Sequence, residues 1–108
     1  MKLPFQVGGV SIGTGELFLI AGPCVIESEE HAMRMAELIR EVTRALGFPF
    51  IFKASYDKAN RTSVKSFRGP GLKEGLRILA AVKDKYQVPV LTDVHETADV
   101  EHVNTTFD

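Results

Sequence analysis

Leu17-Phe18-Leu19-Ile20-Ala21 is an unbroken apolar run, and Gly22-Pro23 closes it. A run of this kind is typical of a strand that is buried on both faces, as in a parallel sheet. Two further apolar runs, residues 50–55 and 88–93, have the same character. Together the three runs predict the strands of one parallel sheet.

A helix is predicted between the first two strands. Ser28 offers a capping oxygen, Glu29 and Glu30 follow it in the first turn, and Gly47 and Pro49 end the helix. The apolar stripe of this helix consists of Ala32, Met35, Ala36, Ile39, Val42 and Leu46. The stripe predicts the face that packs on the sheet.

A second helix is predicted between the second and third strands, after a polar loop at residues 56–70. Its apolar face consists of Leu72, Leu76, Leu79, Val82 and Tyr86. A further helix is expected to start within residues 97–103, and two β-prone runs, residues 2–7 and 10–12, flank the turn dipeptide Gly8-Gly9. Strands that alternate with helices imply an α/β fold with right-handed crossovers.

Length and composition exclude several classes of protein. A formal net charge of −1 over 108 residues gives no global field to attract nucleic acid or an acidic membrane surface, so neither partner is expected. The single Cys excludes an intrachain disulfide scaffold. Because no signal peptide or membrane-span pattern is present, we expect a cytoplasmic protein. The length allows one modest domain and is too short for a complete (β/α)8 barrel, which needs about 200 residues.

Polar side chains follow all three predicted strands, where ligands gather in parallel α/β folds. Cys24 follows the first strand, Lys53 ends the second, and Asp93 and His95 follow the third. The loop at residues 56–70 contains four cationic residues and only one acidic residue. The cationic residues are Lys58, Arg61, Lys65 and Arg68. This local surplus favours an anionic small ligand, and the alternative is a solvated surface loop.

Two of these strand ends leave alternatives open. Cys24 is either a small buried apolar residue or a thiolate that binds a metal ion or acts as a nucleophile. Asp93 and His95 are two residues apart, so on an extended strand they share a face and suit acid/base or metal chemistry. If the chain is already turning there, they only cap the next helix.

Four segments, residues 20–28, 52–63, 67–72 and 91–96, resemble the 3-deoxy-D-manno-octulosonate 8-phosphate synthases. The related 3-deoxy-D-arabino-heptulosonate 7-phosphate synthases are similar around Cys24. The run Lys-Ala-Ser-Tyr-Asp-Lys-Ala-Asn-Arg-Thr at residues 53–62 favours the octulosonate enzymes. The resemblance implies a TIM (β/α)8 barrel preceded by a β-hairpin. We therefore expect one partial domain over residues 1–108, with the hairpin at 1–13 and the first three βα units of an incomplete barrel at 17–108.

The activity that the resemblance implies is an aldol-type condensation. Phosphoenolpyruvate, D-arabinose 5-phosphate and water give 3-deoxy-D-manno-octulosonate 8-phosphate and phosphate, in the synthesis of the lipopolysaccharide inner core. The resemblance also implies a homo-oligomer, because members of this family are homotetramers. Because the family continues well beyond this length, we expect the chain to be a truncated form that is inactive alone.

The resemblance also assigns roles to individual residues. Lys53, Asp93 and His95 are implied as catalytic residues. Cys24 implies the metal-dependent subgroup, with a divalent ion of the Zn, Fe or Mn class whose remaining ligands come from later strands. The substrate-binding residues that the resemblance implies are Lys53 and Lys58 for phosphoenolpyruvate, Asn60, Arg61 and Thr62 for arabinose 5-phosphate, and Arg68.

Two other functions remain open at this point. One is a non-catalytic α/β module that binds anions through Lys53, Lys58, Arg61 and Arg68. The other is a fragment of a heptulosonate 7-phosphate synthase, for which the sugar is erythrose 4-phosphate.

Overall fold

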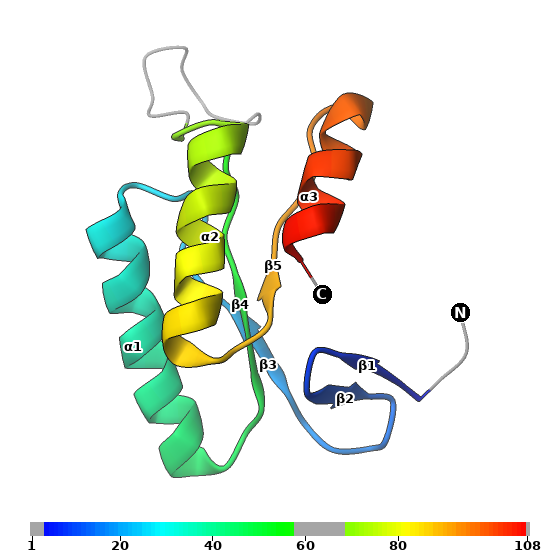
Figure 1. The fold of residues 1–108 in the computed structure, drawn as a ribbon. Coiled ribbons are helices and arrows are strands. Elements are labelled where there is room, and N and C mark those ends of the chain that lie inside the picture. The colour runs from blue at the N-terminus through cyan, green and yellow to red at the C-terminus, as the bar shows by residue number, and fades with distance from the viewer. Residues whose placement is uncertain (1–3, 58–68, 108) are drawn as a thin grey trace.

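A three-stranded parallel sheet and the helices beside it form the main body of the structure (Figure 1). The structure is a computed structural model, and it describes residues 4–57 and 69–107. The elements are β1 (Phe5–Val7), β2 (Val10–Ile12), β3 (Leu19–Ala21), α1 (Glu29–Leu46), β4 (Phe50–Lys53), α2 (Leu72–Tyr86), β5 (Val90–Leu91), the 3-10 turn η1 (Thr97–Asp99) and α3 (Val100–Thr106). The predicted α/β class is confirmed.

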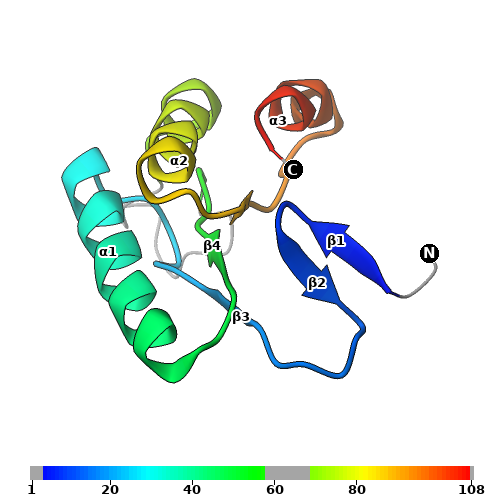
Figure 2. The same ribbon diagram turned by 60° about the horizontal axis from the view of Figure 1, so that its bottom comes forward.

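The sheet has the strand order β3-β4-β5, and both pairs are parallel. Leu19 lies opposite Phe50, and Lys53 lies opposite Leu91. The short strands β1 and β2 pair with each other in antiparallel register around Gly8-Gly9. Figure 2 shows α1, α2 and α3 following one another around the outer side of the sheet, with β1 and β2 on its other side.

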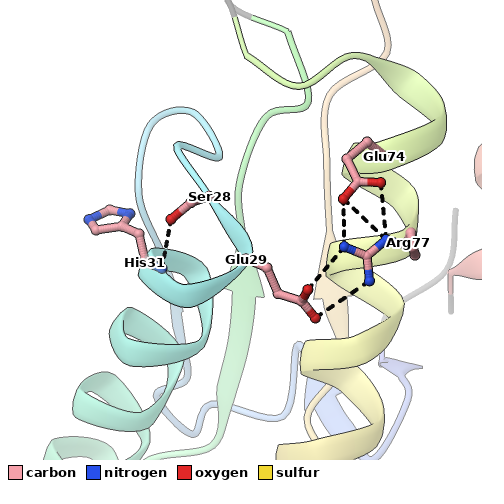
Figure 3. A network of polar contacts seen from close by, with 5 residues as sticks. All are labelled: Ser28, Glu29, His31, Glu74 and Arg77. Atoms are coloured by element: carbon pink, nitrogen blue, oxygen red, sulfur yellow. Dashed lines mark hydrogen bonds and ion pairs between the residues drawn. The ribbon is translucent and has the colours of Figure 1, made fainter.

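Both ends of α1 follow the capping signals in the sequence. The side-chain oxygen of Ser28 accepts a hydrogen bond of 3.0 Å from the backbone N–H of His31 (Figure 3). At the other end Gly47 has φ 77°, a left-handed conformation in which its N–H bonds to the Arg44 carbonyl. A residue without a Cβ adopts this conformation at little cost, so the helix ends here as predicted.

Ser28→Ala is expected to lower the free energy of unfolding by about 1 kcal/mol, because the first turn of α1 loses its capping acceptor. Urea unfolding followed by circular dichroism measures the change. Ser28→Asp is the matched control, since its carboxylate accepts the same bond and favours the helix N-terminus. Equal stability of the Ala variant and the wild type would contradict the capping role.

The hydrophobic core lies between β4 and the inner faces of α1 and α2. Phe52 has no exposed surface, and its ring meets that of Phe50 edge to face at 6.2 Å. The residues of this core are Ile26, Ala32, Ala36, Phe50, Phe52, Ala54, Ile78, Leu79, Val82, Tyr86 and Val90. Leu76, Leu79, Val82 and Tyr86 are buried as the α2 pattern predicts, whereas Leu72 of the same predicted face is only partly buried.

An exposed ion-pair network joins α1 to α2 beside this core (Figure 3). Arg77 of α2 contacts Glu29 of α1 with Nη2 3.0 Å from Oε1, and its Nε donates to Glu74 at 3.0 Å. The hydrogen bond from Arg77 lowers the pKa of Glu74, and the two carboxylates raise that of Arg77. Because exposed pairs of this kind add little stability, the packing of α1 on α2 depends on the core.

Two sequence expectations about burial are wrong. The run 17–21 was expected to be buried on both faces, but Leu19 and Ile20 are 38% and 44% exposed. β3 is an edge strand of the described sheet, so its side chains have fewer neighbours than those of the central strand β4, and Ile20 faces an open pocket. Val42 and Leu46 of the expected α1 stripe are 58% and 63% exposed, since this flank of α1 has no neighbouring element in the part that the structure describes.

A third expectation concerns the loop after β4, which was predicted to be polar. Its first residue, Tyr56, is only 2% exposed and belongs to the interior.

Within residues 4–57 and 69–107, no helix combines the length and the apolar character needed to cross a membrane.

Candidate active site

A pocket of about 500 Å³ lies at the carboxyl ends of β3, β4 and β5. Its wall consists of Ile20, Ala21, Gly22, Pro23, Cys24, Lys53, Ala54, Ser55, Asp57, Asp93 and His95. The structure thus brings together the polar residues that follow all three strands. This arrangement follows from parallel pairing, which places the carboxyl ends of the strands at one edge of the sheet.

Cys24 is held at the pocket by backbone pairing that continues beyond β3. The Cys24 carbonyl accepts a hydrogen bond of 3.2 Å from the Ser55 N–H, and the Ile26 N–H donates to the Ser55 carbonyl at 2.9 Å. These bonds hold Cys24 beside Ser55, which lies two residues after Lys53, the last residue of β4. Cys24 is exposed, which excludes the alternative of a small buried apolar residue.

Gly22 allows the close approach of β3 and β4 at the pocket. A Cβ at this position would overlap the backbone carbonyl group of Lys53. Only glycine leaves room for the Lys53 carbonyl there. Gly22 thereby determines where the Lys53 backbone lies, although the sequence marked it only as the end of an apolar run.

Asp93 and His95 lie side by side, but not on an extended strand as the spacing argument required, because β5 ends at Leu91 and the chain bends at His95. Their nearest atoms, Oδ2 of Asp93 and Nε2 of His95, are 3.5 Å apart. The side chain of His95 is 17% exposed, and its Nε2 is buried with no hydrogen-bond partner among the described residues. A buried nitrogen in this state is available to a bound ligand.

Tyr56 is a residue of this region to which the sequence gave no role. Its hydroxyl donates a hydrogen bond of 2.7 Å to Oδ2 of Asp99 and accepts one of 3.2 Å from the backbone N–H of His95. Burial is the main cause that raises its pKa to about 12, helped by the hydrogen bond to the Asp99 carboxylate and opposed by the His95 N–H. An aromatic residue that directly follows a strand end was the only signal in the sequence.

The raised pKa of Tyr56 predicts a loss of stability in strong base. Because the folded state favours the protonated hydroxyl, its contribution is complete below the unfolded pKa of 10.0 and is lost as the pH rises towards 12. A shift of this size corresponds to about 2 to 3 kcal/mol at most. The measurement is the difference in unfolding free energy between wild type and Tyr56→Phe, which should shrink from about pH 8 to about pH 12. A difference that stays constant would contradict the prediction.

Five of the predicted substrate-binding residues, Lys58, Asn60, Arg61, Thr62 and Arg68, lie outside the described residues. Among the described residues that line the pocket, Lys53 is accompanied by two carboxylates, Asp57 and Asp93. A multiply charged anion therefore needs more cations than this part of the wall supplies.

The side chains on the pocket wall that could bind a metal ion are Cys24, Asp57, Asp93 and His95. Residues 4–57 and 69–107 contain no group of three His, Cys, Asp or Glu side chains placed to hold one. The described donors therefore do not form a complete metal site by themselves.

Comparisons with known proteins add a separate line of evidence. A model of the DAHP synthetase I family matches residues 2–108. The 2-dehydro-3-deoxyphosphooctonate aldolase of Koribacter versatilis is 71% identical over 94 residues, which cover 87% of this chain and 34% of that protein. The aldolases of the same name from Hydrogenovibrio crunogenus and Pisum sativum are each 59% identical, over 93% and 84% of this chain and 36% and 31% of their own lengths. The chain thus spans about a third of the length of these relatives.

Proposed function

The chain belongs to the DAHP synthetase I family, and from this membership we propose that it carries the N-terminal part of a 3-deoxy-D-manno-octulosonate 8-phosphate synthase. The reaction joins phosphoenolpyruvate to D-arabinose 5-phosphate, consumes water and releases phosphate. The observation that carries the proposal is the 71% identity to a protein named for this sugar phosphate. The product of the proposed reaction would serve lipopolysaccharide synthesis.

The proposed fold is the first part of a TIM barrel with an N-terminal hairpin. Two features of the structure support it. The edge of β3 that faces away from β4 has no partner in the described chain, and exposed apolar residues recur every four positions on α1, at Leu38, Val42 and Leu46. A further strand and helix would cover both surfaces and remove an open strand edge.

The proposed site uses the pocket at the strand ends. Lys53, with Lys58, would bind the phosphate and carboxylate of phosphoenolpyruvate, because a lysine ammonium acts as a point charge towards such groups. Asp93 and His95 would line the site beside the reacting carbon atoms and would orient or move a proton there. The proposed arabinose 5-phosphate residues are Asn60, Arg61, Thr62 and Arg68.

Cys24 is proposed as one ligand of a divalent metal ion of the Zn, Fe or Mn class. Its exposed thiol lies on the pocket wall, as a ligand must. The other ligands would come from outside this chain, since the described residues do not complete the set. Such an ion, when bound, can polarise a carbonyl group. The homo-oligomeric state and the cytoplasmic location stay predictions.

A chimaera tests the proposal. Residues 1–108 replace the matching third of the Koribacter versatilis relative, and phosphate release from phosphoenolpyruvate is measured with each sugar phosphate and an added divalent metal. Turnover with arabinose 5-phosphate and none with erythrose 4-phosphate is expected. The reverse preference would favour a heptulosonate 7-phosphate synthase. Calorimetric binding of phosphoenolpyruvate without turnover would favour the non-catalytic module.

Lys53→Met in this chimaera is expected to lower kcat/KM on the order of a hundredfold, because a cation that contacts the substrate's developing charge is lost. Steady-state phosphate release measures the effect. The matched control is Lys73→Met, which removes an exposed lysine on α2 away from the pocket. If both variants turn over like the parent chimaera, Lys53 has no role in the reaction.

A further inference from the structure

Contacts from another residue hold the imidazole ring of His95 in place. Its Nε2 has no hydrogen-bond partner among the described residues, and the nearest carboxylate oxygen, on Asp93, is 3.5 Å away. That separation is at the limit for a hydrogen bond. A ring whose Nε2 is buried and unpaired needs other contacts to keep its direction.

Tyr56 supplies two such contacts. Its ring lies edge-on to the His95 ring, with centroids 5.1 Å apart and an interplanar angle of 81°. Its hydroxyl accepts the backbone N–H of His95 at 3.2 Å. One side chain therefore contacts both the ring and the main chain of His95.

Tyr56 is itself rigidly placed. It is 2% exposed, and its hydroxyl donates to Oδ2 of Asp99 at 2.7 Å. Gly75 on α2 faces it so closely that a Cβ there would overlap the Cβ of Tyr56. The backbone carbonyl of Tyr56 accepts the Gly71 N–H at 3.0 Å. Tyr56 is thus held by α2 on one side and by η1 on the other.

The segment that carries Asp93 and His95 is therefore attached at three places. The Thr92 hydroxyl donates to the Ala54 carbonyl at 2.8 Å. The Tyr56 hydroxyl holds the segment at His95 and again at Asp99. All three bonds run to the chain that directly follows β4, so the end of β4 determines where this part of the pocket wall lies.

We infer that Tyr56 is a positioning residue, whose hydroxyl and ring hold the His95 imidazole at the pocket wall. Tyr56 is not among the residues that line the pocket, so it acts through His95 and does not touch the ligand. Its importance for turnover rests on the proposed function, whereas its effect on the placement of His95 does not.

The first test measures the accessibility of His95 directly. The chain is treated with diethylpyrocarbonate, and the modification rate of each histidine is followed by mass spectrometry. Tyr56→Phe keeps the ring and removes the hydroxyl, and it is expected to speed the modification of His95 severalfold. The exposed His102 serves as the internal reference, since its rate should not change.

Two more variants make this test specific. Asp99→Ala removes the acceptor of the Tyr56 hydroxyl and is expected to speed the modification of His95 in the same way. Tyr86→Phe removes the hydroxyl of the only other tyrosine in the chain and is expected to leave the His95 rate unchanged. An unchanged His95 rate in both Tyr56→Phe and Asp99→Ala would overturn the inference.

The second test uses the chimaera described above. Tyr56→Phe is expected to lower kcat about tenfold with a smaller change in KM, as when the supporting partner of a site residue is lost. Full activity of the variant would overturn the role in turnover. If the parent chimaera has no activity while Tyr56→Phe still exposes His95, the proposed function fails and the placement of His95 by Tyr56 stands.

Discussion

Gly22→Ala is expected to lower the free energy of unfolding by about 3 kcal/mol, because the added methyl group has no space. Its Cβ would overlap the backbone carbonyl group of Lys53 on the neighbouring strand. Neither backbone can move aside cheaply, since the pairing of β3 with β4 and the later bonds between Cys24 and Ser55 hold both. The strand ends must separate, and the pocket between them must change shape.

Urea unfolding followed by circular dichroism measures this loss, and Gly9→Ala is the matched control. Gly9 lies in the turn between β1 and β2, where an added Cβ meets nothing within 4 Å. Its replacement is expected to change stability by less than about 0.5 kcal/mol. In the chimaera, Gly22→Ala should also weaken the binding of phosphoenolpyruvate. A Gly22→Ala variant as stable as the Gly9→Ala variant would show that the strands do not approach as closely as the structure has them.

Phe52→Ala is expected to cost about 3 to 5 kcal/mol of unfolding free energy, as deletion of a buried phenyl ring does. Phe52 has no exposed surface and lies in β4, the central strand. The cavity would open between the sheet and the two helices, next to Phe50. Since small domains have about 5 to 15 kcal/mol in total, this single change would remove a large part of the stability.

Phe48→Ala is the control for this prediction, because it deletes the same ring from a position that is 39% exposed. Its cost should be clearly smaller than that of Phe52→Ala in the same urea titration. Phe48 lies just before β4 and Phe52 within it, so the two variants compare an exposed with a buried ring in the same part of the chain. Equal costs would mean that the core is not centred on β4.

The helices were predictable from local patterns. Ser28 and Gly47 mark the ends of α1 in the sequence, and the structure has its helix from Glu29 to Leu46 between them. The buried positions of α2 follow the helical spacing of Leu76, Leu79 and Val82. Caps and periodicity act within a few residues, so no tertiary contact is needed to recognise them.

The burial of the first strand and of one flank of α1 was not predictable in the same way. An apolar run shows that a segment can be buried, but the elements beside it decide whether it is. Ile20 and Val42 are apolar but 44% and 58% exposed in the described chain. In the proposed complete barrel these positions would be covered.

The candidate site also has some features that were predictable from the sequence and others that were not. The positions of Cys24, Lys53, Asp93 and His95 at or just after strand ends were predictable, because the strand pattern and the polar residues are local features. Parallel pairing then brought them to one pocket. The role of Gly22 beside Lys53 and that of Tyr56 beside His95 become visible in the folded chain alone. Those roles depend on contacts across 31 and 39 residues of chain, and such contacts form only when β4 lies beside its neighbours.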